Sequence, residues 1–487
     1  MEPQLTKYVN TVKMEEMPPD APETSKGPKT FSVEDAVETI GFGRFHIMLF
    51  LIMGSTGIAE AMEIMLLAVI SSSIRCEWHL QSWQVALVTM MVFFGYMIFS
   101  IVLGLLADRY GRLKILTLSF LWGAYFSLLT SFAPTYAWFV FLRCMVGCGV
   151  SGHSQGLIIK TEFLPKNFRG YMLPLSQLFW LGGSLLIIGL GSVVTPSLGW
   201  RWLVRFASIP GIILILVFKF VPESARYNVS VGKDQAAMET LGRIAKINRS
   251  KMPEGRIHEP VAENLGSFMD LLDPKYRRTS LQIWVIWLGI AFAYYGVILA
   301  SSELLENNLL CGTGPVQGSI SVEKGEGPCH CNMLSTSDYH TMIISTIGEI
   351  ALNPFNILGI NLIGRRWTLG ITMTTTGVFF LLLIICLSRT GLIAILFCLR
   401  ALVSANFNTI YIYTAEVYPT VMRAIGMGTS GSLCRIGAMA APFIAQVLLS
   451  ASIIGGLCLF AGVCFVCALS AFTLPIETKG RALQQVK

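Results

Sequence analysis

The sequence is poor in charged residues. Only 13% of its 487 residues are Asp, Glu, Lys or Arg, whereas 53% are hydrophobic and the mean hydropathy is +0.62. A soluble domain uses about 25% charged residues to cover its surface, so this composition excludes an ordinary soluble protein. Apolar runs of about twenty residues recur along the chain, and each is long enough to cross a bilayer as a helix. The sequence therefore predicts an all-α, multi-pass membrane protein.

Three further features are missing, and each excludes a class of protein or segment. The sequence has no Gly-x-x-x-x-Gly-Lys-Ser/Thr phosphate-binding loop, so ATP-driven pumping by this chain alone is not expected. It has no recognisable filter or ring motif of a channel. Residues 1–43 are polar and contain no apolar core before a cleavage site, so no cleavable signal peptide is expected. The net charge of +7 is concentrated in particular loops, which indicates membrane orientation and not nucleic-acid binding.

The apolar runs predict twelve membrane helices. The first six lie at 44–70, 84–106, 113–132, 136–158, 172–194 and 202–221, and the other six at 281–303, 340–362, 368–388, 391–414, 424–449 and 453–474. They form an N-terminal bundle over 44–221 and a C-terminal bundle over 281–474. The polar segment 222–280 is the linker between the bundles, and 1–43 and 475–487 are polar tails.

Two motifs occur once in each half. The segment from Gly104 to Arg112 returns in eroded form from Gly359 to Arg366, and Gly111 and Gly364 lie 253 positions apart. The segment Glu162 to Arg169 is echoed by Glu416 to Arg423 at an offset of 254. Because internal repetition fixes architecture, the repeat unit is half of the protein.

We expect the repeated motifs to form a gating latch in each half. Gly111 permits a tight reversal, Arg109 and Arg112 contact anionic headgroups, and Asp108 pairs with them. In the second copy Asn361 and Leu362 replace the Asp and the first Arg, which predicts a weaker latch. The gating set is Gly104, Asp108, Arg109, Gly111, Arg112, Glu162, Arg169, Gly364, Arg365, Glu416 and Arg423.

Positive charge alternates between the two sets of loops. The set that includes the first motif, the linker and the C-terminal tail carries most of the Lys and Arg. Because these residues resist translocation, the sequence predicts that both termini and 222–280 are cytoplasmic. The enlarged loop 304–339 is then on the opposite face.

The loop 304–339 contains cysteines on the face where disulfides are permitted. We expect at least one disulfide among Cys76, Cys311, Cys329 and Cys331. The alternative is a metal site at Cys329, His330 and Cys331, but its spacing does not match the usual zinc knuckle. No metal and no cofactor are therefore expected.

Ionisable side chains inside the predicted helices are the candidate substrate and coupling residues. Each costs about 2.5–3.5 kcal/mol at membrane depth unless it has a partner or a wet cavity. Glu60 and Glu63 lie three apart and are expected to share a helix face. Glu349 and Asn353 belong to a polar stripe that no lipid-facing surface would keep. The complete set is Glu60, Glu63, Arg143, Glu349, Asn353, Arg400 and Arg435.

Each of these residues also has a structural interpretation. An acidic residue of the first helix could do no more than neutralise an arginine, and Arg143 or Arg435 could do no more than neutralise a carboxylate. His153, placed near the cytoplasmic end of the fourth helix, is interpreted as a packing residue rather than a proton carrier. The aromatic residues Trp287, Tyr294 and Tyr295 are likewise interpreted as packing residues.

Taken together, the motifs resemble those of the major facilitator superfamily. The segments that carry the resemblance are Gly104 to Arg112, Arg143 with Gly147 and Gly149, Glu162 to Gly170, Pro222 to Arg226 and Pro475 to Arg481. Ile40 to Phe45, Ala59 to Glu63 and Cys76 to Trp78 resemble the synaptic vesicle 2-related proteins, in particular their "-like" paralogues, in the organic-ion-transporter-related branch. The resemblance implies two six-helix bundles with both termini cytoplasmic. In the organic-ion branch, the position matching Arg435 tends to be Arg in anion carriers, so the resemblance favours an anion.

The predicted function is secondary active transport of a small organic ion, with an anion favoured, by alternating access around a site between the bundles. A coupling proton or sodium ion, a lipid bilayer and a monomeric state are expected, with no nucleic-acid partner and no enzymatic activity. The membrane is the plasma membrane or an intracellular vesicle membrane. The rival is a transporter-like binding or receptor protein without net transport, and the cost of keeping ionisable residues in the membrane favours transport.

Tags inserted in 222–280 and in 304–339 test the predicted orientation. An antibody should reach the tag in 222–280 only in permeabilised cells, because the positive loops stay cytoplasmic, whereas the tag in 304–339 should be extracellular or lumenal. Labelling of the 222–280 tag without permeabilisation would contradict the twelve-helix prediction.

Overall fold

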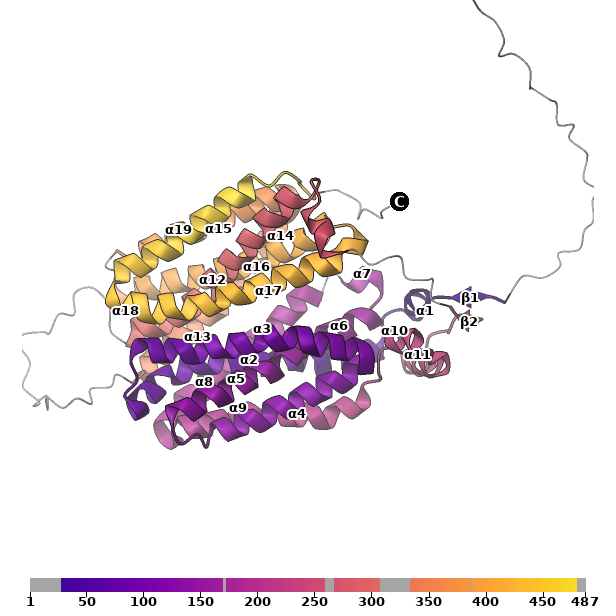
Figure 1. The fold of residues 1–487 in the computed structure, drawn as a ribbon, viewed down its shortest axis with the longest axis horizontal. Helices are drawn as coiled ribbons and strands as arrows, with labels where there is room; N and C mark the ends of the chain where they lie inside the picture. The colour runs from indigo at the N-terminus through magenta and orange to yellow at the C-terminus, as the bar shows by residue number, and fades with distance from the viewer. Residues whose placement is uncertain (1–27, 170–171, 259–266, 307–332, 386, 480–487) are drawn as a thin grey trace, which may run out of the picture.

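The computed structural model describes residues 28–169, 172–258, 267–306, 333–385 and 387–479. Its helices form two bundles that lie side by side (Figure 1). The N-terminal bundle contains α2 (Arg44–Trp78), α3 (Ser82–Tyr110), α4 (Arg112–Thr130), α5 (Tyr136–Val150), η1 (Ser151–His153), α6 (Ser154–Phe163), α7 (Lys166–Arg169), α8 (Met172–Leu198), α9 (Trp200–Val217) and η2 (Phe218–Phe220). The C-terminal bundle contains α12 (Arg277–Glu306), α13 (Thr336–Ala351), α14 (Asn353–Leu362), α15 (Arg365–Leu382), α16 (Arg389–Val417), α17 (Thr420–Pro442), η4 (Phe443–Leu448), α18 (Leu449–Ala451) and α19 (Ile453–Phe472).

Ten helices in the described ranges are long and apolar enough to cross a membrane. The predicted span 136–158 corresponds to α5, η1 and α6, where a turn of 3-10 helix interrupts the α-helix. The predicted span 368–388 corresponds to α15, an 18-residue helix that contains a run of threonines. The count of twelve crossings and their sidedness stay predictions.

The first helix continues eight residues beyond its predicted end at residue 70. Ser71, Ser72 and Ser73 follow directly after the predicted end. All three side chains are buried, and the Ser71 hydroxyl donates to the backbone carbonyl of Ala68. Serine is compatible with a membrane helix where it packs against other helices, so the helix extends to Trp78.

The segment 222–280 is more ordered than a plain linker. It contains α10 (Ala225–Ser230), α11 (Asp234–Asn248), β2 (Arg256–Ile257) and η3 (Phe268–Leu272), and α12 already begins at Arg277. Residues of the N-terminal tail pack against it: α1 (Val33–Ile40) lies on α11, and β1 (Thr30–Phe31) pairs in parallel with β2. The Asn248 amide oxygen accepts the Phe45 N–H at 2.9 Å, which ties α11 to the start of α2. We call this side of the bundles the linker end and the opposite side the loop end.

Glycines let the helices of the N-terminal bundle approach closely. A Cβ atom added at Gly147 would lie 2.1 Å from the Val92 carbonyl oxygen, so α5 contacts the backbone of α3 directly. The two bundles meet where α3 packs on α17 and where α8 packs on α13. These two contacts enclose the space in which the candidate site lies.

The predicted disulfide is not tested by the fold. Cys311, Cys329 and Cys331 lie outside the described residues, and only Cys76, in the last turns of α2, lies within them. A disulfide among the four cysteines stays a prediction.

Candidate functional site

A central cavity of about 510 Å³ lies between the bundles. This volume is in the range of pockets that hold small organic molecules. One wall is α8 of the N-terminal bundle, and the others are α12, α13, α16 and α17 of the C-terminal bundle. The lining side chains are Gln177, Trp180, Trp287, Tyr294, Tyr295, Glu349, Ile350, Ser404, Phe407, Tyr411, Met427, Cys434 and Arg435, together with Gly428 and Gly431.

Three predicted arginines lie deep within their helices, and two of them have a carboxylate partner. Arg143 contacts Glu63 with 3.1 Å between Nη1 and Oε2, and Arg400 contacts Glu349 with 2.7 Å between Nη2 and Oε1. In the described part of the chain, Arg435 has no carboxylate at ion-pair distance. Its guanidinium lies instead 3.8 Å from the ring centroid of Tyr96, a residue of the other bundle. Arg435 is therefore a cavity cation that no neighbouring carboxylate contacts.

Glu60 and Glu63, which lie three apart on the first helix, have different partners. The Glu60 carboxylate accepts the Tyr96 hydroxyl at 3.3 Å, and the ring of the same Tyr96 is the one that Arg435 covers. The Glu63 carboxylate accepts the Ser127 hydroxyl at 2.7 Å and contacts Arg143 inside the N-terminal bundle. The first helix therefore presents one acidic residue toward Arg435 and the other toward its own bundle.

Asn353 takes part in a ring of amides at the linker end of the cavity. The Gln177 amide oxygen accepts from Asn353 Nδ2 at 2.9 Å and from Asn408 Nδ2 at 3.0 Å. Asn408 Nδ2 also donates to Asn353 Oδ1 at 3.1 Å, and Gln177 Nε2 donates to Asn408 Oδ1. Since Gln177 belongs to the N-terminal bundle and both asparagines to the C-terminal bundle, the ring joins the bundles.

At the loop end of the cavity, an ion pair joins the two bundles. Arg75, near the end of α2, contacts Glu303, near the end of α12, with 3.2 Å between Nη2 and Oε2. The described bundles are thus connected on both sides of the cavity, by neutral amides at one end and by an ion pair at the other.

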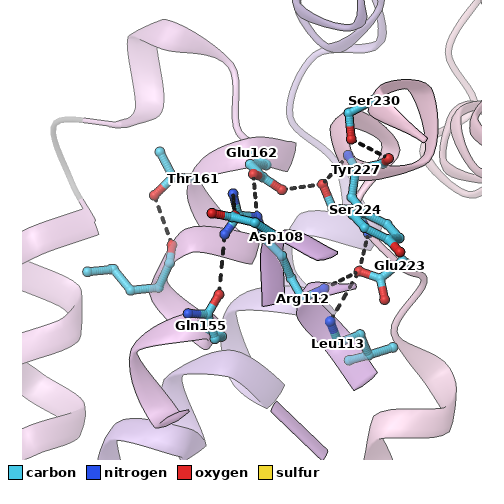
Figure 2. A network of polar contacts seen from close by, with 11 residues as sticks. Asp108, Arg112, Leu113, Gln155, Thr161, Glu162, Glu223, Ser224, Tyr227 and Ser230 are labelled. Atoms are coloured by element: carbon cyan, nitrogen blue, oxygen red, sulfur yellow. Dashed lines mark hydrogen bonds and ion pairs between the residues drawn. The ribbon is translucent and has the colours of Figure 1, made fainter. Parts of the chain in front are cut away.

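The first gating motif forms a polar network around Arg112 (Figure 2). The Arg112 guanidinium contacts Glu162 at 2.9 Å and Asp108 at 3.2 Å, and it donates to the Gln155 amide oxygen at 3.3 Å. Gly111 has a φ of 114°, a backbone conformation that favours glycine, and this turn aims α4 at the network. Glu162 is mostly buried whereas Asp108 is mostly exposed, so Glu162 is the stronger partner.

The second copy is built as fully as the first, although it lacks the Asp. Arg365 contacts both oxygens of Glu416, with Nε to Oε2 at 2.9 Å and Nη2 to Oε1 at 3.0 Å. Of these two contacts, the one from Nη2 to Oε1 is a hydrogen bond. Gly364 has a φ of 109°, so the turn is repeated as well. The second copy therefore keeps the Arg to Glu contact without the Asp, and a weaker second latch stays a prediction.

Three predicted gating residues contribute less to these networks, and the side chain of a fourth is not described. The Arg109 guanidinium lies 5.5 Å from the ring of its neighbour Tyr110, and its carbonyl accepts the Tyr227 hydroxyl at 3.1 Å. A Cβ atom at Gly104 would meet no atom within 4 Å. Arg423 has no ion-pair partner in the described ranges, and the side chain of Arg169 lies outside the described part.

Two acidic residues of the latches were missed by the sequence analysis. Glu223 accepts the backbone N–H groups of Arg112 at 3.0 Å and Leu113 at 3.1 Å, and Glu477 accepts those of Arg365 at 3.0 Å and Arg366 at 3.2 Å. Both carboxylates therefore cap the start of a helix, where negative charge is favoured. The signal was present, because Glu223 and Glu477 are 254 positions apart, the same offset as Glu162 and Glu416.

Comparison with known proteins places this geometry in a family. A family model described as sugar (and other) transporter matches residues 44–321. The chain belongs to this family. It is 75% identical, over 95% of each chain, to the Homo sapiens protein named "Putative transporter SVOPL". It is 40% identical to the synaptic vesicle 2-related protein of Rattus norvegicus, over 94% of this chain and 83% of that protein.

The fold agrees with that of solved transporters of the same superfamily. The inward open conformation of the xylose transporter XylE from E. coli superposes with a TM-score of 0.61 over 90% of this chain and 98% of that chain, at 15% identity. The resemblance to the major facilitator superfamily and to the synaptic vesicle 2-related proteins is thereby confirmed, as is a multi-pass integral membrane protein. The transporter's substrate and coupling ion are a separate question.

Replacing Glu162 or Asp108 tests the first latch. An exposed ion pair contributes about 0.2–1 kcal/mol, so Asp108→Asn should shift the balance between conformations only a few-fold. Glu162→Gln removes the buried partner of Arg112 and should shift it further toward opening at the linker end. The readout is the labelling rate of Cys434, a cavity residue, by an impermeant thiol reagent added from the linker side, with Cys434→Ser as the background. Wild-type rates in both variants would remove the gating role.

Proposed function

We propose that the protein is a secondary active transporter that moves a small organic anion by alternating access. In this proposal twelve helices cross the membrane, and both termini and the linker 222–280 are cytoplasmic. The bundles 44–221 and 281–474 rock against each other around the central cavity. The contacts at the two ends of the cavity then break in turn, with the amide ring opening toward the linker end and the Arg75 to Glu303 pair opening toward the loop end.

The observation that carries the choice of an anion is the position of Arg435. A guanidinium in a low-dielectric site is costly without a counter-charge, and the other two deep arginines have one. A carboxylate, sulfate or phosphate group on the substrate would supply the missing charge, and the planar guanidinium suits such groups. The rival view, in which Arg435 only neutralises a carboxylate of its own chain, lacks a contact to support it within the described residues.

The rest of the cavity favours an anion with an apolar, ring-bearing body. Trp180, Trp287, Tyr294, Phe407 and Tyr411 supply large aromatic surfaces, which bind flat apolar groups well. The family description names sugars, and XylE is a xylose transporter, but a neutral sugar would leave Arg435 without a counter-charge. The aromatic side chains interpreted from sequence as packing residues therefore belong to our proposed binding site.

The coupling ion that we propose is a proton. Each membrane carboxylate is contacted by hydrogen-bond donors: Glu60 by a tyrosine hydroxyl, Glu63 by Ser127 and Arg143, and Glu349 by Tyr294 and Arg400. A sodium ion needs several oxygen ligands and no adjacent guanidinium, so these surroundings suit proton uptake better. Protonation of Glu63 or Glu349 would weaken its ion pair and so change the packing inside one bundle.

The names of related proteins suggest a membrane in which the protein acts, and the cavity contacts weigh against the rival function of a receptor without net transport. Names of synaptic vesicle 2-related proteins support a vesicle membrane as the site of action. A binding or receptor protein that no longer transports would not need contacts between the bundles at both ends of a central cavity. Those contacts favour transport as the function.

Charge changes at Arg435 test the anion. Arg435→Glu should abolish uptake of an aromatic carboxylate into vesicles, and Arg435→Lys should weaken it by about tenfold because the two-point contact is lost. Arg389→Lys is a matched control, since Arg389 pairs with Asp338 at the loop end, outside the cavity. Its uptake should equal that of the wild type. If both Arg435 variants reach the membrane and transport an anion with wild-type affinity, Arg435 does not bind the substrate.

A further inference from the structure

A second, much smaller void lies inside the N-terminal bundle, next to Glu63. Its volume is about 20 Å³, which is room for one water molecule. Glu63 of α2 and His153 of η1 both line it, and the remaining walls come from α4, α5 and α9. No residue of the C-terminal bundle lines it, so this void is separate from the central cavity.

His153 has an unsatisfied polar atom at this place. The side chain is 6% exposed, and its Nδ1 atom is buried without a hydrogen-bond partner in the described part of the chain. The ring stacks on Phe120 with 4.0 Å between centroids and 14° between planes, so its orientation is fixed. A buried ring nitrogen without a partner is costly, and a water in the void would satisfy it.

The chain around His153 is also irregular. His153 ends the 3-10 turn that separates α5 from α6, and such turns inside longer helices often mark functional positions. The helix continues for ten residues to Phe163, so His153 lies about 15 Å from that end. This depth corrects the prediction that His153 lies close to the cytoplasmic end, and it puts the imidazole within reach of the buried carboxylate.

We propose that His153 and one water in this void deliver the coupling proton to Glu63, by a route inside the N-terminal bundle that avoids the substrate cavity. This inference rests on the proposed proton coupling. The imidazole takes a proton at one ring nitrogen and releases one to the water, which passes a proton to a Glu63 oxygen. The neutral Glu63 acid then weakens its contact with Arg143, whose Nη2 still donates to the Glu63 carbonyl at 2.8 Å.

The other groups around the void do not titrate in the relevant range. From α4 and α9 it is lined by Phe120, Gly123, Ala124, Ala207, Ser208 and Gly211, and from α5 by Val150. Arg143 of α5 and Ser127 of α4 contact Glu63 itself. Within the described residues, His153 and Glu63 are therefore the two titratable side chains that line the void.

Two glycines in the wall allow the water to be removed without touching either titratable group. A Cβ atom at Gly211 would lie 3.7 Å from its nearest neighbour, Phe120, and one at Gly123 would lie 4.0 Å from Gly149, so both alanines fit. Gly182 of α8 is a matched control, because an added Cβ there meets nothing within 4 Å and it does not line the void.

The test is time-resolved infrared spectroscopy of the full chain in lipid vesicles after flash release of protons. The carboxylic acid band that disappears in Glu63→Gln reports protonation of Glu63. Gly211→Ala and His153→Phe should slow the rise of this band by about tenfold or more, with the same final amplitude, while Gly182→Ala keeps the wild-type rate. His153→Gln, which retains a hydrogen bond but carries no proton, should also be slow and guards against misfolding of the Phe variant.

Wild-type rates in Gly211→Ala and in both His153 variants would overturn the relay. The absence of a Glu63 band at every pH would also overturn it, because there would be no proton to deliver. Anion uptake and its dependence on Arg435 are measured separately, so the loss of the relay does not by itself contradict the proposed transport.

Discussion

The structure depends on how the positive charges of arginines buried in the helices are balanced by neighbouring groups. A guanidinium at membrane depth costs about 2.5–3.5 kcal/mol, which is a large part of the stability of a bundle. Arg143 and Arg400 are each held by a carboxylate of their own bundle, so these charges can remain buried while the bundles move. Arg435 differs, because it contacts a tyrosine ring of the opposite bundle. Among the three deep arginines of the described residues, Arg435 is therefore the one that contacts no carboxylate, and it lies at the interface between the bundles.

The duplicated latches connect neighbouring helices within each bundle at the linker end. In each half an arginine at the start of a helix contacts a glutamate one helix further along, and another glutamate caps the same helix start. The ion pairs Arg112 to Glu162 and Arg365 to Glu416 occur at equivalent points of the repeat. The described contacts between the bundles differ in chemistry at the two ends of the cavity. Salt has little effect on hydrogen bonds between the neutral amides, whereas dissolved ions partly screen the Arg75 to Glu303 pair.

Much of the fold could be predicted because its signals are local or periodic. The lengths of the apolar runs locate the helices, and the repeat offset of about 254 residues relates Glu162 to Glu416. The site was predicted less well, because it depends on which face each side chain takes. Glu60 and Glu63 are neighbours in sequence but have partners in α3 and α5, and a helical spacing of three does not specify those partners. The first helix was predicted to end at residue 70, before three buried serines, since composition does not show whether a polar residue packs inside a bundle.

The central claim is that the cavity binds a ring-bearing anion at Arg435. The most direct measurement is the thermal stability of the purified protein with a matched pair of ligands, an aromatic acid and the amine with the same ring. A ligand that binds the folded state raises the melting temperature, by an amount that grows with the logarithm of its concentration divided by its Kd. The acid should stabilise the wild type, the amine should not, and the acid should lose its effect in Arg435→Glu. Stabilisation by the amine with no effect of the acid would contradict the claim.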